Sequence, residues 1–154
     1  MTRHTIRAVE ADRSEPSWRG GYRDLAGTIA GALLIWVGAY LPWLRANPGY
    51  EPIGLVPSLM TPGVASVHFV LLFPAVVVVA ARIGRGATRG WALATLVTGL
   101  WAVLFAGLLL GAQYTAGGLR FAPDVGWALT VGGGLALALV GGLALFESEA
   151  PSPR

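Results

Sequence analysis

The stretch LAGTIAGALLIWVGAYLPWL, residues 25–44, decides the fold of this chain. It is free of charged residues over about twenty positions, and Arg23 and Arg45 lie just beyond its two edges. At a rise of about 1.5 Å per residue, a helix of this length matches the roughly 30 Å hydrocarbon core of a bilayer. Because no A-x-A-like cleavage pattern follows, we interpret the stretch as a retained first membrane helix and not as a signal peptide.

The composition indicates a membrane protein as well. Of the 154 residues, 55% are hydrophobic and 12% are charged, which is about half the charged fraction of a typical soluble domain. All eleven basic residues are arginines dispersed between the apolar runs, so a nucleic-acid partner is not expected. The chain contains no cysteine, which excludes disulfides, thiol nucleophiles and thiolate metal sites.

Three further apolar runs predict an all-α polytopic membrane protein with a bundle of four transmembrane helices. In the second run, residues 76–79 are all valine, but an unpaired strand would leave its backbone groups unsatisfied in lipid, so we expect a helix there. Pro74 lies near the middle of this run and is expected to kink it. The expected helices cover about residues 25–44, 64–83, 91–114 and 125–146, with external loops at 45–63 and 115–124, a disordered N-terminal tail at 1–24 and a C-terminal tail at 147–154.

The arginines also predict the orientation of the bundle. Nine of them fall in the two tails and in the turn between the second and third helices, whereas Arg45 and Arg120 fall on the other side. Positive charge collects on the cytoplasmic side of membrane proteins. We therefore expect both termini in the cytoplasm and the proline-rich loop outside.

Few side chains within the apolar runs could carry chemistry. His68 is the one ionisable candidate, about one turn inside the second helix; it could be a proton relay, a ligand or a pH sensor. The alternative, which we favour, is an interfacial histidine that hydrogen-bonds to a loop or a neighbouring helix. The other histidine, His4, lies in the opposite tail, so a metal site is not expected. No nucleophile-elbow, zinc-protease, phosphate-loop or dinucleotide motif occurs, which predicts no enzyme activity and no cofactor.

Small residues at four-residue spacing are the strongest packing signal. Such residues let membrane helices approach closely. The pattern indicates either packing within one bundle, which we favour, or contact with a second copy or a partner membrane protein. The residues concerned are Gly27 and Gly31 in the first helix, Gly107 and Gly111 in the third, and Thr130, Gly134, Ala138 and Gly142 in the fourth.

Two tryptophans lie at mid-depth, away from the usual interfacial belts. Trp36 and Trp101 each stand about ten residues from the cytoplasmic edge of their helices. Because a buried indole N–H needs an acceptor, we expect both side chains to face the interior of the bundle.

The plan of the chain resembles that of small four-span membrane proteins of archaea and actinobacteria, and its lysine-free composition is similar to haloarchaeal sequences. The matching elements are Leu41-Pro42-Trp43 at the end of the first helix, the loop motif Asn47-Pro48-Gly49-Tyr50, and Val125-Gly126-Trp127 before a glycine run. The resemblance implies a four-helix integral membrane protein with no assigned activity and no catalytic residues to transfer.

These observations predict a non-enzymatic membrane protein that contacts other membrane components, in the manner of an accessory subunit. The alternative is a small transporter or channel component, which would need several copies to line a pore because the runs lack internal charge. A membrane-embedded enzyme using His68 and Asp124 is a third possibility.

Overall fold

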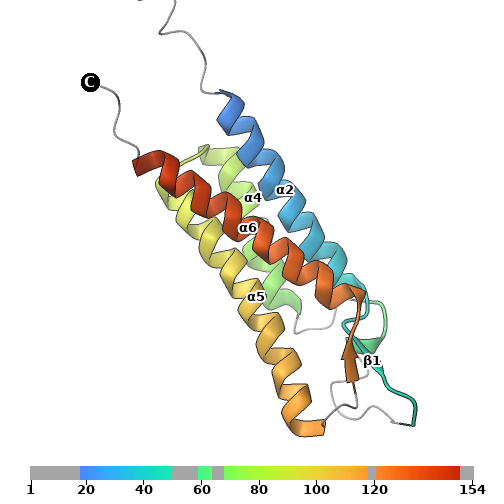
Figure 1. The fold of residues 1–154 in the computed structure, drawn as a ribbon. Coiled ribbons are helices and arrows are strands. Elements are labelled where there is room, and N and C mark those ends of the chain that lie inside the picture. The colour runs from blue at the N-terminus through green and yellow to red at the C-terminus, as the bar shows by residue number, and fades with distance from the viewer. Residues whose placement is uncertain (1–17, 50–58, 64–67, 118–120, 150–154) are drawn as a thin grey trace, which may run out of the picture.

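The computed structural model describes residues 18–49, 59–63, 68–117 and 121–149, and this part of the chain is predominantly helical (Figure 1). The described helices are α2 (Trp18–Tyr40), α4 (Phe69–Arg85), α5 (Arg89–Gly117) and α6 (Val125–Glu149). Two short strands, β1 (Leu44–Ala46) and β2 (Phe121–Pro123), pair antiparallel, with Arg45 opposite Ala122.

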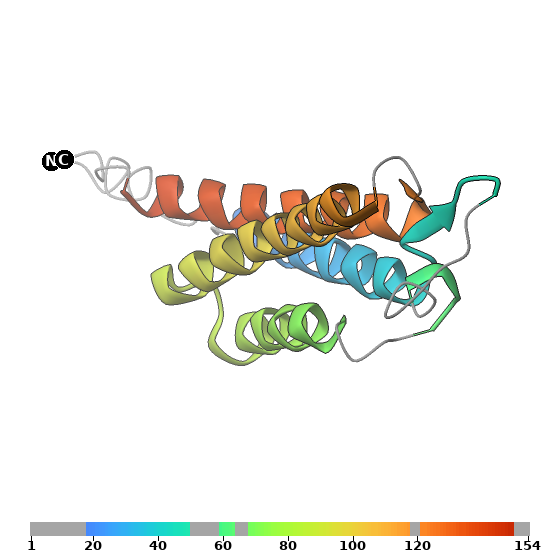
Figure 2. The ribbon, with the colours of Figure 1, turned by 90° about the horizontal axis from the view of Figure 1, so that it is seen from below.

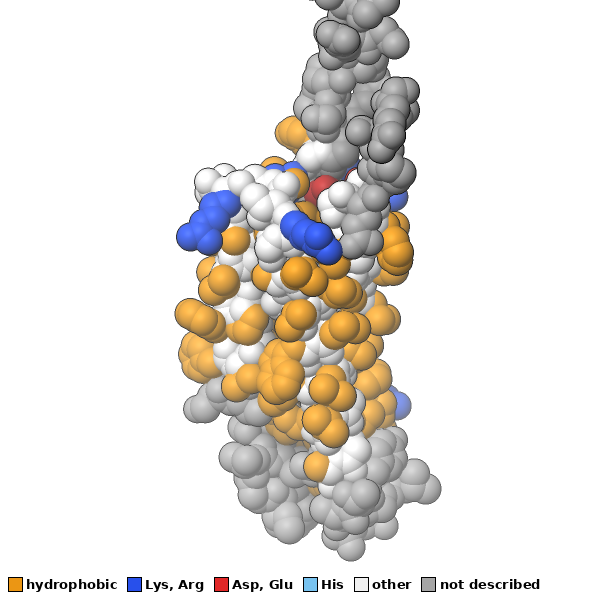
Figure 3. All heavy atoms as spheres, turned by 90° about the vertical axis from the view of Figure 1, so that its left-hand side faces the viewer, with side chains coloured by type: hydrophobic (Ala, Val, Ile, Leu, Met, Phe, Trp, Pro, Cys, Tyr) orange, Lys and Arg blue, Asp and Glu red, His pale blue; other side chains and the backbone are white. Residues whose placement is uncertain are grey.

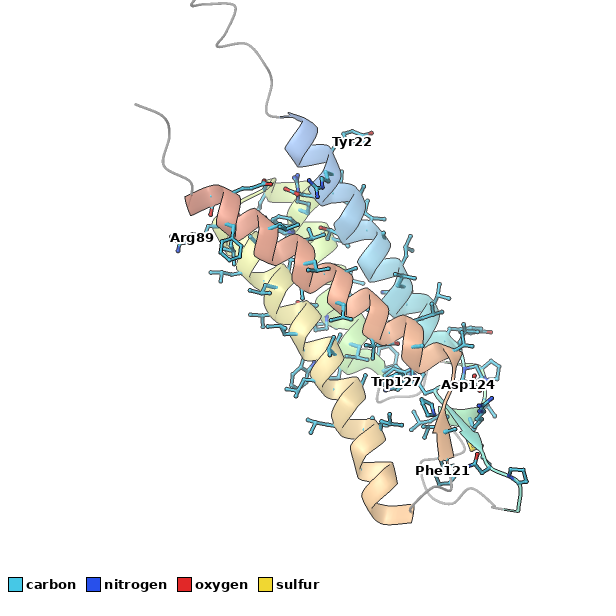
Figure 4. All side chains as sticks on the ribbon, viewed as in Figure 1. Tyr22, Arg89, Phe121, Asp124 and Trp127 are labelled. Carbon is cyan, nitrogen blue, oxygen red and sulfur yellow. The ribbon has the colours of Figure 1, made fainter. Side chains whose placement is uncertain are left out.

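The bundle has two chemically different ends. The charged end consists of the start of α2, the turn between α4 and α5, and the end of α6, and the ribbon end carries β1 and β2. Figure 4 shows Tyr22 and Arg89 at the charged end and Phe121 and Asp124 at the ribbon end. The charged residues of the charged end include Arg23, Asp24, Arg82, Arg85, Arg89 and Glu147.

Helix α6 is the central element of the fold. It runs antiparallel to both α2 and α5 and packs against both, whereas α4 packs against α2 and α5 on the side away from α6 (Figures 1 and 2). The core along these contacts combines alanines with larger side chains such as Ile35 and Leu137, both fully buried. Small side chains allow this close approach of the helix backbones.

Glycines at seven-residue spacing form the contact between α2 and α6. A Cβ at Gly38 would lie 2.7 Å from the carbonyl oxygen of Gly126, and a Cβ at Gly133 would lie 2.6 Å from that of Gly31. These positions lie seven residues apart in each helix. Two antiparallel helices that keep the same faces together over seven residues cross at a shallow angle, as in left-handed bundles.

The same spacing recurs between α6 and α5. A Cβ at Gly134 would lie 2.9 Å from the carbonyl oxygen of Gly99, and one at Gly141, seven residues later, would lie 2.6 Å from that of Ala92. Helix α6 therefore presents two glycine faces, one to α2 and one to α5. No larger residue fits at these four backbone contacts without moving a helix.

The helix boundaries differ from the expected ones mainly in the first helix. Helix α2 begins at Trp18, within the expected disordered tail, and ends at Tyr40, before Pro42. The additional turns are held by a bond between the Arg82 guanidinium and the carbonyl oxygen of Gly21, 2.6 Å long. Residues 1–17 of the expected tail lie outside the described residues.

The β1–β2 ribbon lies largely within the two expected external loops, 45–63 and 115–124, for which the sequence predicts no strands. The segments that follow α2 and precede α6 pair through β1 and β2. Next to the ribbon, the amide of Asp124 donates to the carbonyl oxygen of Trp43 (2.8 Å), and the amide of Gly126 donates to that of Pro42 (2.9 Å). The start of α6 is thereby fixed to the end of α2.

Among the described residues, two helices are long and apolar enough to cross a membrane, by length and composition. They are the segments Arg89–Ala112 of α5 and Val125–Ser148 of α6, and 28% of the most apolar window of each is buried inside the bundle. A core helix of a soluble protein would be mostly buried. The exposed side chains of these helices include Leu104, Leu108 and Leu139, and Figure 3 shows hydrophobic side chains covering the middle of one face, with arginines near the charged end.

Candidate functional site

Two prolines leave helix carbonyl groups without their usual donors, and tryptophans satisfy both. Proline has no N–H, so the carbonyl four residues earlier loses its helical partner. Pro42 frees the carbonyl of Gly38, which accepts a 2.9 Å bond from the indole of Trp43. Pro74 likewise frees the carbonyl of Val70, which accepts a longer bond, 3.4 Å, from the indole of Trp101. The second bond joins α5 to α4, and α4 continues through Pro74 to Arg85.

A double-mutant cycle tests the pairing of Pro74 with Trp101. Trp101→Phe removes the indole donor and keeps an aromatic ring, so we expect the free energy of unfolding to fall by about 1 kcal/mol. In the Pro74→Ala background the backbone amide restored at this position can donate to the carbonyl of Val70, and the cost of Trp101→Phe should approach zero. Unfolding of the four proteins in mild detergent gives the coupling energy. An equal cost in both backgrounds would show that the indole does not replace the missing amide.

His68 lies in a buried aromatic contact at the ribbon end. It precedes α4, is 1% exposed, and its ring centroid lies 4.9 Å from that of Trp43. Within the part of the chain that the structure describes, no group of three His, Cys, Asp or Glu side chains could hold a metal ion. Asp124 has a local role, because its carboxylate accepts a 2.7 Å hydrogen bond from the backbone amide of Val125 at the start of α6. These contacts indicate that His68 packs against Trp43 and that Asp124 hydrogen-bonds to the start of α6.

The small residues expected to pack divide into three sets. Gly27 and Gly31 face α6, where their Cβ atoms would meet Val140 and Leu137. In α6 the expected single stripe divides: Thr130 faces Gly38 of α2, whereas Gly134 and Ala138 face Gly99 of α5. A Cβ at Gly107 or Gly142 would meet no described atom of another segment within 4 Å, so a larger side chain has open space at these two positions.

The structure places Trp36 and Trp101 on the outer surface, contrary to the expectation that both face the interior. Trp36 is 50% exposed and Trp101 is 40% exposed. The contacts of α6 with α2 and α5 are backbone to backbone at the glycines, and neither tryptophan lies on such a contact. Trp101 nevertheless satisfies its N–H from the surface through Val70. The two tryptophans thus flank α4, Trp36 beside Ala75 and Val76 and Trp101 beside Val70.

A polar cavity of about 240 Å³ lies at the charged end between the start of α2, the α4–α5 turn and the end of α6. Burial raises the pKa of the Asp24 carboxyl, the negative charge of Glu147 raises it further, and Arg82 and Arg23 oppose both effects. The Arg82 guanidinium lies 5.1 Å from the centre of the Trp91 ring, a cation–π contact. The cavity is lined by Asp24, Ala87, Thr88, Arg89, Trp91, Ala92, Ala144, Glu147 and Ser148.

Arg82 is the polar link that sequence reasoning missed. It joins α4 to α2 through Gly21 and to α5 through Trp91, whose own indole donates to the carbonyl of Val78 at 3.2 Å. A sequence signal existed, because an arginine in the last turn of one helix and a tryptophan near the start of the next favour such a contact.

An apolar groove lies between α2 and α4, with a volume of about 420 Å³. Its floor includes Ala32 and Ala75, which are buried, and its rims include Leu33 and Trp36, which are exposed. The full lining is Ile29, Ala32, Leu33, Trp36, Ala75, Val76, Val79, Ala80 and Ile83. The bundle thus has a closed, glycine-packed interior and an open apolar face along α4.

No protein-family model, no curated protein and no solved structure matched the chain when it was compared with them.

Proposed function

We propose that this chain is a multi-pass membrane protein in which all four described helices cross the bilayer. Helices α5 and α6 meet the length and hydropathy requirement on their own. Helices α2 and α4 pack alongside them, so they occupy the same depth (Figures 1 and 2). In the sequence, the segments 25–44, 69–81, 90–112 and 125–146 contain no charged residue, as the cost of charge in hydrocarbon requires.

In this proposal the charged end faces the cytoplasm. It holds Arg23, Arg82, Arg85 and Arg89, whereas Arg45 is the described arginine of the ribbon end. The rule that positive charge stays on the cytoplasmic side supports this orientation. The termini would then both be cytoplasmic, because α2 starts and α6 ends at the charged end.

The proposed role is non-enzymatic: the chain binds other membrane components through the outer face of α4. The observation that carries this proposal is the exposure of two mid-depth tryptophans, Trp36 and Trp101, on either side of that helix. Tryptophan is enriched among residues that dominate binding energy at interfaces. The polar groups considered for catalysis, His68 and Asp124, have local structural contacts instead.

Because the chain lacks cysteine, single-cysteine variants test the topology directly. Pro48→Cys lies beyond the ribbon end and Ser148→Cys at the charged end. A membrane-impermeant maleimide should label Pro48→Cys in intact cells and Ser148→Cys only after the membrane is opened. The reverse pattern would overturn the orientation, and labelling of both in intact cells would overturn the even number of spans.

The binding role is tested by purification from membranes in a mild detergent. We expect a component in fixed ratio to the chain that is lost with Trp36→Ala and kept with Leu139→Ala, an exposed control on α6. Solute flux through vesicles containing only this chain would contradict the proposal and favour a transporter. A turnover that His68→Ala abolishes would favour an enzyme.

A further inference from the structure

The polar cavity at the charged end brings together carboxyl groups from the first and the last described helix. Asp24 lies near the start of α2 and Glu147 near the end of α6, and both line the same cavity of about 240 Å³. Figure 1 shows that these two helix ends lie at the same end of the bundle. Two negative charges that face one cavity repel each other. Ionisation of both carboxyls therefore opposes closure of the cavity.

The arginines around the cavity are engaged elsewhere or lie in water. They are Arg82 of α4, Arg89 at the start of α5 and Arg23 of α2 itself. The Arg82 guanidinium donates to the carbonyl oxygen of Gly21 at 2.6 Å and lies 5.1 Å from the centre of the Trp91 ring, and its buried Nε has no hydrogen-bond partner among the described residues. Arg23 and Arg89 are exposed, so water screens their charges.

The balance of these effects favours a proton on Asp24. Burial raises the pKa of its carboxyl, Glu147 raises it further, and the attraction of Arg82 and Arg23 does not reverse the shift. Between the ordinary pKa of the unfolded chain and the raised pKa of the folded chain, the folded chain binds more protons. The free energy of unfolding therefore increases as the pH falls through this range.

We propose that the charged end is an acid-strengthened contact, in which one proton taken up from water by the Asp24 carboxyl brings the start of α2 and the end of α6 together across the cavity. The proton removes one of the two negative charges, and the protonated carboxyl then donates a hydrogen bond to the Glu147 carboxylate. The contact responds to the pH on the side of the membrane that the charged end faces. It does not depend on what the outer face of α4 binds.

Thermal unfolding of the full chain in mild detergent, between about pH 8 and about pH 4.5, tests the role of Asp24. Asp24→Asn is neutral at every pH. We expect it to raise the Tm at the alkaline end of this range by at least about 2 °C, and to gain less on acidification than the natural chain. The control Asp124→Asn, at the ribbon end, should gain at least as much as the natural chain. A lower Tm in Asp24→Asn would show that attraction to the arginines outweighs burial and repulsion, and would overturn the proposal, as would an equal gain on acidification.

A distance measurement tests whether the helix ends move together. Because the chain contains no cysteine, spin labels can be attached at Tyr22→Cys and Phe146→Cys, both exposed at the charged end. We expect acid to shorten the mean distance between the labels, and to leave it unchanged when Asp24→Asn is also present. A control pair at the ribbon end, Tyr40→Cys and Val125→Cys, is also exposed and should keep its distance.

Two results of the distance measurement would overturn the proposal even if the Tm changes as expected. One is a charged-end distance that stays constant on acidification, which would show that protonation stabilises the fold without closing the cavity. The other is an equal shortening with and without Asp24→Asn, which would show that another group takes up the proton.

Discussion

Gly99→Leu is expected to destabilise the bundle by about 3 kcal/mol, at the upper end of the usual cost of overpacking. A side chain at Gly99 would clash with the backbone of Gly134 and Ala138 in α6. Backbone atoms cannot change rotamer, so relief requires α5 to move away from α6. Because α6 is the helix that holds α2 and α5 together, that movement should loosen the whole fold. Thermal unfolding in mild detergent, followed by circular dichroism, measures the loss.

Gly107→Leu is the matched control, because it makes the same substitution two turns later in the same helix. A Cβ at Gly107 meets no described atom within 4 Å. The substitution also replaces glycine by a better helix former, which favours the helix by about 1 kcal/mol. We therefore expect the stability of Gly107→Leu to equal or exceed that of the natural chain. A large loss of stability in Gly107→Leu would show that this face of α5 packs against a second copy.

Comparing Gly99→Leu with Gly107→Leu also distinguishes glycine packing within one bundle from glycine packing between copies. If Gly99→Leu leaves a folded monomer and abolishes only an assembly, the α5–α6 contact lies between copies and not within one bundle. If the monomer itself unfolds, the contact is internal. Gly134→Leu or Ala138→Leu, on the facing helix, should give the same outcome as Gly99→Leu.

The glycine contacts show what the sequence could and could not predict. The number and approximate position of the four helices follow from hydropathy and from the arginines between the runs. Four-residue spacing places Thr130 and Gly134 on one stripe, whereas in the structure they face different helices. The pairs Gly27–Gly31 and Gly134–Ala138 each share a face at this spacing, and the backbone contacts also repeat every seven residues, as at Gly31 and Gly38. Because a glycine-rich helix satisfies several spacings at once, its partner face depends on neighbours that the sequence alone does not place.

The surface tryptophans show a second limit of prediction from the sequence. The need of a buried indole for an acceptor predicts Trp36 inside, yet α2 turns its glycines toward α6 and leaves Trp36 half exposed. The sequence shows that Pro74 leaves a carbonyl at Val70 that needs a donor, but it does not show that Trp101 supplies the donor. The helix that would supply the donor follows only from the packing of α4 against α5. The groove between α2 and α4 likewise depends on tertiary arrangement.

Trp43→Ala is expected to cost about 3–5 kcal/mol, the range for truncating a buried large aromatic side chain. Trp43 is 1% exposed and lies against the ring of His68. Its backbone amide donates to the carbonyl oxygen of Leu59 at 2.7 Å. The side chain therefore fills the space where the end of α2, the segment at Leu59 and the start of α4 meet. Alanine would also leave the Gly38 carbonyl, already deprived of a helical donor by Pro42, without the indole.

Trp43→Phe separates the two contributions of this residue, and Trp36→Ala supplies the control. Phenylalanine keeps most of the buried ring and loses the indole N–H, so its cost should be close to that of one buried carbonyl left without a donor, about 1–3 kcal/mol. Trp36 lies in α2, seven residues before Trp43, and is half exposed, so Trp36→Ala should change the unfolding free energy by less than about 1 kcal/mol. Equal losses for Trp43→Ala and Trp36→Ala would contradict the view that Trp43, and not the surface tryptophan, joins α2 to the start of α4 and α6.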